Sequence, residues 1–166
     1  MASGNTLAVF TPLSNEPPSA NFATLDTRNL HVVLDFDPTT DEEAVFRGVM
    51  PQNYAGGGIT LKIHFMLTSG TSGDGVWQAA FEALAAQDAD SDGFAAFQSS
   101  GAVAANGTNG IESIATITFT DGAQMDSVAA GGAFRLKIRR DADNTSATDS
   151  ITGSDLELTL VEMRET

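Results

Sequence analysis

The sequence predicts an all-β domain: an antiparallel β-sandwich of about eight strands with an extended N-terminal arm. Apolar and polar residues alternate strictly in several segments, most clearly over 59–67 and 134–139, which is the two-residue period of a strand with one buried face. Sixteen glycines are spread between the apolar segments. No recurring helical pattern lies between the strand candidates, as a parallel sheet would require.

Length and charge narrow the class of protein further. The 166 residues fit one domain that can bury its strand faces without disulfides, and the chain has no cysteine. The formal net charge of −14 repels phosphate backbones and anionic bilayers, so neither nucleic acid nor a membrane is an expected partner. The first twenty residues carry no Lys or Arg, unlike a usual signal peptide.

Residues 1–27 differ in composition from the rest of the chain. Pro12 and the pair Pro17–Pro18 stand among small polar residues, a pattern typical of an extended segment with few anchors. It is either a frayed terminus or an arm that becomes ordered on a partner subunit. We therefore divide the chain into an arm, 1–27, and a jelly-roll β-sandwich domain, 28–166, which is expected to fold without the arm.

The strand candidates follow one another at intervals. Alternation from Leu30 to Phe36 is closed by the turn signal Asp37–Pro38. Three glycines, 56–58, lead into the long strand at 59–67, and a run rich in Ser and Gly ends it. Their number and spacing are those of a sandwich or jelly roll. In order, the candidates are 30–36, 43–49, 59–67, 76–83, 94–98, 111–120, 134–140 and 155–163.

The segment Val76 to Gln87 has two interpretations. Trp77, Phe81 and Leu84 have the i, i+4, i+7 spacing of a short amphipathic helix, which Asp74 would cap. The same segment also satisfies a period of two through alternate apolar residues up to position 83. We favour the strand, because the neighbouring segments are strands.

An incomplete calcium-loop motif follows. Asp88, Asp90, Asp92 and Gly93 reproduce the first half of such a loop, in which alternate carboxylates converge on a hard cation. The position of the bidentate Glu is occupied by Ser99, which favours a solvated turn. The same residue types recur, more sparsely, at Asp141, Asp143 and Asn144.

Catalytic groups are scarce. His31 and His64 are the only imidazoles, and both lie opposite the apolar residues of predicted strands, as exposed or interface side chains do. No Gly-x-Ser-x-Gly elbow exists, and the glycines at 56–58 lack the Lys of a phosphate-binding loop. Acidic residues such as those at 41–43 are too common to single out a glycosidase pair. We therefore assign no catalytic residue, no cofactor and no metal.

Half of the cations lie in one strand. Four of the eight Lys and Arg residues fall within 134–140, and alternation sends Arg135, Lys137 and Arg139 to the polar face. We expect them to pair with acids of the last strand, Asp155 and Glu157. Docking of this positive face on an acidic subunit is the alternative.

Two parts of the sequence resemble jelly-roll virion structural proteins of tailed bacteriophages. The likeness covers about residues 28–166, and its motifs are structural, not catalytic. In the first half it is carried by Leu34–Asp37, Asp41–Phe46, Met50–Tyr54 and the glycine-led strand at Ile59. In the second half it is carried by Phe134–Asp141, Asp149, Gly153, Asp155, Leu156, Leu158, Val161, Glu162 and Arg164.

The resemblance implies a non-enzymatic head decoration or cement protein, a homotrimer bound to the major capsid protein. Its place would be the capsid surface of the virion, after assembly in the host cytoplasm. A tail or neck accessory is the alternative within the same setting. A different class is a carbohydrate-binding jelly roll that presents Trp77, Tyr54 or loop carboxylates, although Trp77 is expected in the core.

Overall fold

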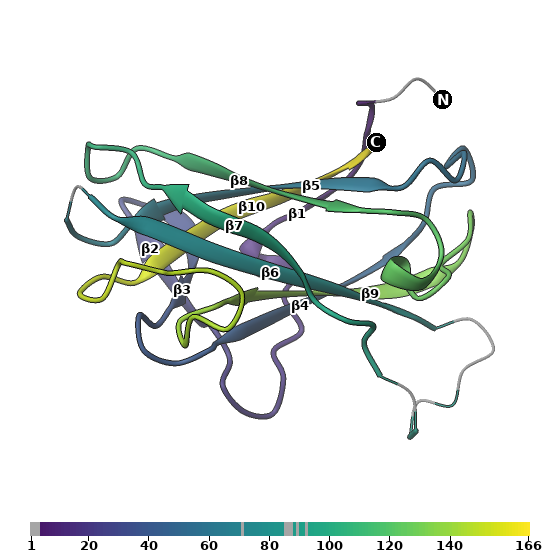
Figure 1. The fold of residues 1–166 in the computed structure, drawn as a ribbon, viewed down its shortest axis with the longest axis horizontal. Coiled ribbons are helices and arrows are strands. Elements are labelled where there is room, and N and C mark those ends of the chain that lie inside the picture. The colour runs from purple at the N-terminus through teal and green to yellow at the C-terminus, as the bar shows by residue number, and fades with distance from the viewer. Residues whose placement is uncertain (1–3, 71, 85–87, 89, 92) are drawn as a thin grey trace.

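The chain folds into two antiparallel β-sheets packed face to face (Figure 1). The computed structural model describes residues 4–166 except 71, 85–87, 89 and 92. Ten strands and two short 3-10 helices, η1 (Pro12–Ser14) and η2 (Ala123–Met125), are assigned within this part of the chain. The strands are β1 (Thr6–Phe10), β2 (Thr24–Arg28), β3 (His31–Phe36), β4 (Glu43–Val49), β5 (Ile59–Leu67), β6 (Asp74–Ala83), β7 (Gln98–Ala104), β8 (Ser113–Phe119), β9 (Ala133–Arg140) and β10 (Leu156–Glu165).

Strand order identifies the sandwich as a jelly roll. One sheet runs β2-β3-β10-β5-β8, with β1 also pairing with β10, and the other runs β4-β9-β6-β7. The eight strands from β3 to β10 therefore stand in the order first, eighth, third and sixth in one sheet, and second, seventh, fourth and fifth in the other. This is the winding of two Greek keys around one core, and it confirms the predicted fold class.

The alternating pattern places the core between the sheets. In β5, Ile59, Leu61 and Ile63 are fully buried, while Thr60 and Lys62 point outward and are half-exposed. Removing one face of each strand from water is the main favourable term in such a fold. Seven of the eight predicted strands are confirmed with small shifts at their ends, over 31–36, 43–49, 59–67, 74–83, 113–119, 133–140 and 156–165.

The ambiguous segment is a strand. β6 lies between β7 and β9 and is buried almost throughout. Its apolar residues therefore point to both faces of the sheet, and for this reason they also fit the spacing of a helix. The helix interpretation is wrong for the residues up to Ala83. Residues 85–87, the end of the ambiguous segment, lie outside the described residues.

One strand was predicted at the wrong place. Residues 94–97 form no strand, and β7 begins at Gln98 instead. β7 consists of small residues, and Gly101 takes a positive φ of 65° within it, so it carries no alternating signal. The apolar residues that suggested a strand, Phe94 and Phe97, lie over the cations of β9.

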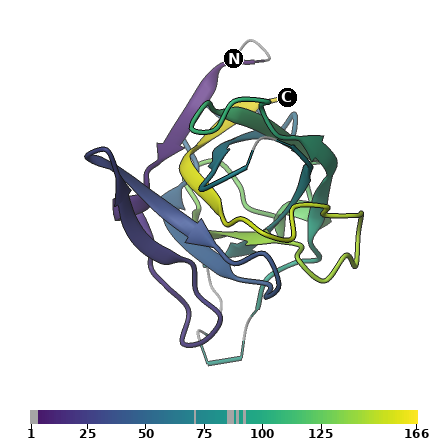
Figure 2. The ribbon, with the colours of Figure 1, turned by 90° about the vertical axis from the view of Figure 1, so that its left-hand side faces the viewer.

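The segment predicted to be an arm is part of the sandwich. β1 pairs with β10, and β2 pairs with β3 along its whole length. Phe10 is buried against Phe46 and Phe134, with ring centroids 5.5 and 6.3 Å apart. Figure 2 shows these N-terminal strands against one side of the sandwich. The expectation of an extended segment with few anchors is therefore corrected for residues 4–27.

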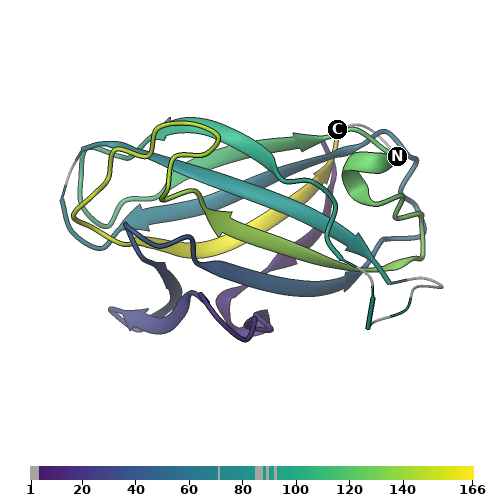
Figure 3. The same ribbon diagram turned by 60° about the horizontal axis from the view of Figure 1, so that its bottom comes forward.

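Between β1 and β2 the chain runs along the free edge of β4 (Figure 3). Glu16 N donates to Val45 O (2.7 Å), Val45 N donates to Asn15 Oδ1 (2.9 Å), and Ala23 N donates to Glu43 O (3.0 Å). These bonds occupy backbone groups that an edge strand would otherwise offer to other chains. The segment thus fastens the edge of one sheet to the other sheet.

Candidate functional site

An exposed apolar surface lies on the N-terminal segment. Leu13, Phe22 and Leu25 are 71%, 48% and 54% exposed, and we call these three residues the N-terminal apolar surface. They line a groove of about 250 Å³ together with Pro12, Asn15, Pro17, Ala23 and Thr24. The groove is held by the hydrogen bonds to β4 described above, so the surface is presented by an anchored backbone. A gathered apolar surface of this kind marks an interaction site more often than scattered single residues do.

Glu16, between the groove residues Asn15 and Pro17 in the sequence, forms an exposed ion pair. Arg47 Nε lies 3.4 Å from Glu16 Oε2, and both side chains are more than half exposed. Exposed pairs of this type contribute little to stability. They remain available to an approaching partner, for which they would set orientation.

The aromatic residues proposed for sugar binding are buried. Trp77 is fully buried, and its ring stands edge-on to Phe36 with centroids 4.9 Å apart. Tyr54 is 7% exposed, and its hydroxyl donates to Asp121 Oδ1 (2.8 Å). The expectation that Trp77 lies in the core is confirmed, and the alternative in which Trp77 or Tyr54 presents an exposed ring is excluded.

The positive face of β9 is paired with acids of this chain, on β4 and β6 and just before β4. Arg135 Nε donates to Glu82 Oε2 (2.5 Å), Lys137 Nζ lies 2.7 Å from Glu43 Oε2, and Arg139 Nη1 lies 3.3 Å from Asp41 Oδ2. Phe94 and Phe97 cover these cations from outside, with cation-to-centroid distances between 4.1 and 5.0 Å. The face is therefore satisfied inside the chain.

The prediction that this face pairs with Asp155 and Glu157 is wrong. β9 and β10 belong to different sheets, so their polar faces point to opposite sides of the sandwich. Glu157 instead pairs with Arg28, whose Nη1 lies 2.6 Å from Glu157 Oε2. The charge of the strand predicts that its cations form ion pairs with acids. Which acids they pair with depends on strand order.

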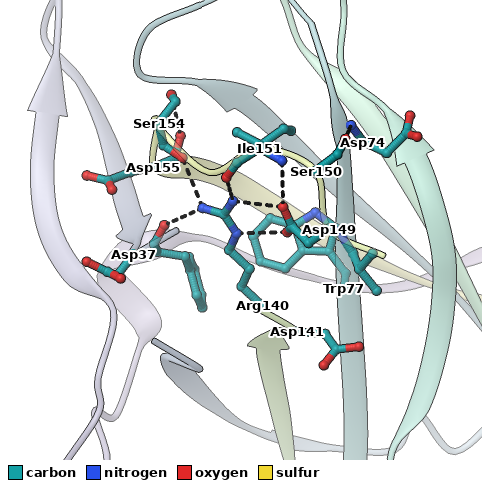
Figure 4. A network of polar contacts seen from close by, with 12 residues as sticks. Asp37, Asp74, Trp77, Arg140, Asp141, Asp149, Ser150, Ile151, Ser154 and Asp155 are labelled. Atoms are coloured by element: carbon teal, nitrogen blue, oxygen red, sulfur yellow. Dashed lines mark hydrogen bonds and ion pairs between the residues drawn. The ribbon is translucent and has the colours of Figure 1, made fainter. Parts of the chain in front are cut away.

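Arg140 is the centre of a buried polar network (Figure 4). Alternation turns this last residue of β9 inward, and its side chain is fully buried. Nε and Nη2 donate to the two carboxylate oxygens of Asp149 at 2.9 and 3.0 Å. The guanidinium also donates to the backbone carbonyls of Phe36 (3.1 Å), Ser154 (3.0 Å) and Ile151 (2.5 Å). All the contacts are internal, so the network joins β3, β9 and the loop before β10.

Asp141 is bound by its own loop. Its Oδ1 accepts from Thr145 N (3.0 Å) and Oγ1 (2.7 Å), and its Oδ2 accepts from Ser146 N (2.8 Å) and Oγ (2.5 Å). Burial opposes ionisation of the carboxyl, but the Ser146 and Thr145 hydrogen bonds hold its pKa well below the ordinary value. The carboxylate thus caps the loop that follows β9.

The second calcium candidate, around Asp141 and Asp143, also includes Asp41, which the sequence did not indicate. Asp41 joins Asp141 and Asp143, with one ligand oxygen from each within 4.8 Å of the others. The acceptor capacity of Asp141 is used by its loop, and Asp41 already faces Arg139 and accepts from Asp143 N (3.1 Å). Asn144 Oδ1 accepts from Asp149 N (2.5 Å). The three carboxylates therefore have partners within the chain, and their proximity is explained without a metal ion.

The first calcium candidate is described only in part. Asp88 Oδ1 accepts from Asp90 N (3.0 Å), as in a short polar turn. Asp92 lies outside the described residues.

The two histidines lie on the outer faces, as expected. His31 is exposed, and His64 Nδ1 lies 3.2 Å from Glu112 Oε2. Thr159 Oγ1 donates to the backbone oxygen of His64 (3.3 Å).

Asp35, on the outer face of the sheet, has an environment that disfavours its ionised form. Asp35 stands directly opposite Glu157 in the β3–β10 pair, and its Oδ1 is buried with no hydrogen-bond partner. Burial, followed by the charge of Glu157, raises the pKa of Asp35 to about 6. The ionised form therefore destabilises the fold.

Replacing Asp35 by asparagine is accordingly expected to stabilise the protein at neutral pH. Because the folded pKa lies above the ordinary value of 3.8, this group contributes most stability in acid and loses it as pH rises through 6. After discounting for solvent screening, the gain of D35N is about 1 kcal/mol at pH 7.5. Urea unfolding at pH 7.5 and pH 4.5 measures it, and an equal gain at both values would contradict the assignment.

Similarity to known proteins is found at the level of solved structures. No family model matches the chain, and no curated protein matches it. Among solved structures, the chain is similar to a carbohydrate-binding module (CBM6cm-2) from Cellvibrio mixtus lichenase 5A in complex with cellotriose. The identity is 10%, the TM-score is 0.48, and the match covers 98% of this chain and 99% of that one. At this level the likeness decides nothing about what this chain binds.

No helix among the described residues has the length and apolar character needed to cross a membrane.

Proposed function

We propose that the protein is a non-enzymatic β-sandwich module that acts by binding a surface, and that it decorates the outside of a bacteriophage head. The N-terminal apolar surface is the observation that carries this proposal. Its large apolar side chains are exposed on a segment that is hydrogen-bonded to the sandwich. Burying such a surface on a partner is favourable in proportion to the apolar area removed from water.

The resemblance of the sequence to jelly-roll virion proteins supplies the setting. The partner would be the major capsid protein, and the protein would self-associate as a homotrimer. Several copies that each bind weakly across subunit junctions would hold a lattice by multivalency. The net charge of −14 favours solubility of the free protein and keeps it from packaged DNA.

Copy number on purified particles tests this setting. A head decoration protein is expected at a stoichiometry of the order of hundreds per particle, because it follows the repeats of the capsid lattice. Quantitative mass spectrometry of particles measures the copy number. A few copies per particle would point to a tail or neck accessory instead, and absence from particles would refute a virion role. Light scattering of the free protein tests the trimer.

A carbohydrate-binding module is the second candidate. The observation that favours it is a hollow of about 600 Å³ that includes several polar side chains, since jelly rolls also serve as lectin domains. Its lining offers amide, hydroxyl and carboxylate groups that could hydrogen-bond sugar hydroxyls, from Gln98, Ser99, Thr118, Thr120, Asp121 and Gln124.

Calorimetric titration with soluble oligosaccharides separates the two candidates. A sugar site in this hollow predicts saturable binding that the Gln98→Ala variant loses. The decoration proposal predicts no such binding.

A further inference from the structure

Two carboxylates lie near the turn at 55–58, at the end of the sandwich where β10 finishes. Glu165 is the last residue of β10, and its Oε1 accepts from Ala55 N (2.6 Å). Asp121 follows β8, and its Oδ1 accepts from the Tyr54 hydroxyl (2.8 Å). Glu165 therefore contacts the turn directly, and Asp121 is connected to it through the Tyr54 hydroxyl, which also accepts from Gly58 N (3.1 Å).

Glu165 is a buried anion with most of its hydrogen-bonding capacity unused. The residue is 3% exposed, and its Oε2 is buried without any partner. Within the described part of the chain, no ion pair includes Glu165 or Asp121. A buried carboxylate that lacks partners is costly unless a proton, a water or a cation compensates it.

The surroundings of the turn are negative and rich in oxygen. The Tyr54 hydroxyl, between Asp121 Oδ1 (2.8 Å) and Gly58 N (3.1 Å), adds a further oxygen beside the turn. A Cβ on Gly57 would lie 3.4 Å from the backbone oxygen of Thr166, and a Cβ on Gly56 would lie 3.9 Å from Asp121 Oδ2. The glycines thus let oxygen atoms approach the backbone of the turn closely.

The turn is also accessible from outside. Tyr54, Ala55, Gly56 and Asp121 line a hollow of about 470 Å³. An ion in this hollow would meet Asp121 directly, and the wall of the hollow includes Ala55, whose amide binds Glu165.

We propose that this turn binds a divalent cation of the hard, oxygen-seeking class, such as Ca²⁺, with the carboxylates of Glu165 and Asp121 as ligands. Such cations take carboxylate and carbonyl oxygens, and Glu165 Oε2 is an oxygen that the fold leaves without a partner. The Asp41, Asp141 and Asp143 group differs in this respect, because its buried carboxylate is fully hydrogen-bonded. The proposal does not rest on the proposed function.

Calorimetric titration of the metal-free protein with Ca²⁺ tests the site. Wild type is expected to bind with a rise in Tm, and Glu165→Gln, which keeps the shape of the side chain, is expected to bind at least tenfold more weakly. Asp143→Asn, in the other acidic group, is the matched control and should bind like wild type. In EDTA, Glu165→Gln should have a higher Tm than wild type, because it removes an uncompensated buried charge.

Terbium, a luminescent substitute for Ca²⁺, gives a positional readout. Tyr54 is the only tyrosine in the chain, and its hydroxyl donates to the proposed ligand Asp121, so it should sensitise bound Tb³⁺. Tyr54→Phe should lower this luminescence while binding remains. Absence of Ca²⁺ binding by wild type, unchanged affinity in Glu165→Gln, or loss of binding in Asp143→Asn would each overturn the proposal. If Glu165→Gln does not fold, Asp121→Asn takes its place with the same expectation.

Discussion

Arg140→Met is expected to lower the free energy of unfolding by about 3–5 kcal/mol, the usual cost of removing one partner of a buried ion pair. The change leaves Asp149 as an uncompensated carboxylate with 2% of its side chain exposed. It also removes the donors to the carbonyls of Phe36, Ile151 and Ser154. Urea unfolding monitored by the fluorescence of Trp77, which is the only tryptophan, measures the loss.

Arg135→Met is the matched control for this prediction. Arg135 lies on the outer face of the same strand with its side chain 33% exposed, and it also pairs with an acid, Glu82. Its partner is buried, so some loss is expected, but smaller than for Arg140, because water can reach the pair. Equal losses for the two variants would show that the Arg140 network does not hold the sheets together.

Removal of residues 1–27 is expected to abolish cooperative folding. The deletion takes β1 from the sheet, removes Phe10 from the core and uncovers the edge of β4. The single change Phe10→Ala should already cost about 3–5 kcal/mol, the range for truncating a buried phenylalanine. Val9→Ala, at a neighbouring exposed position, should cost less than about 1 kcal/mol. A truncated chain with the wild-type unfolding midpoint would contradict the integrated N-terminal segment.

Strand positions could be predicted where one face is buried and the other is wet. β4 and β5 have the expected bounds, because their side chains alternate between core and solvent. β7 could not be found in this way, since its small residues leave no apolar face to detect. β1 and β2 were missed because prolines between them suggested an unanchored segment, whereas Pro12 is buried in η1.

The candidate sites depended more heavily on tertiary structure. The burial of Arg140 follows from the same alternation that placed Arg135 outward, and the charge of the residue hid that signal. Glu165 and Ala55 are 110 positions apart in the chain. They come into contact only because β10 pairs with β5. No local motif reports such a contact. The exposed Leu13 and Leu25 are likewise recognised only once the core has been identified.

Binding of a double variant to purified particles tests the central claim most directly. Leu13→Ser/Leu25→Ser changes only residues whose side chains are more than half exposed, so its unfolding midpoint should stay close to that of wild type. Co-sedimentation with particles that lack the native protein is expected to fall at least tenfold relative to wild type, because the surface that the partner would bury has become polar. Undiminished co-sedimentation by this folded variant would contradict the account.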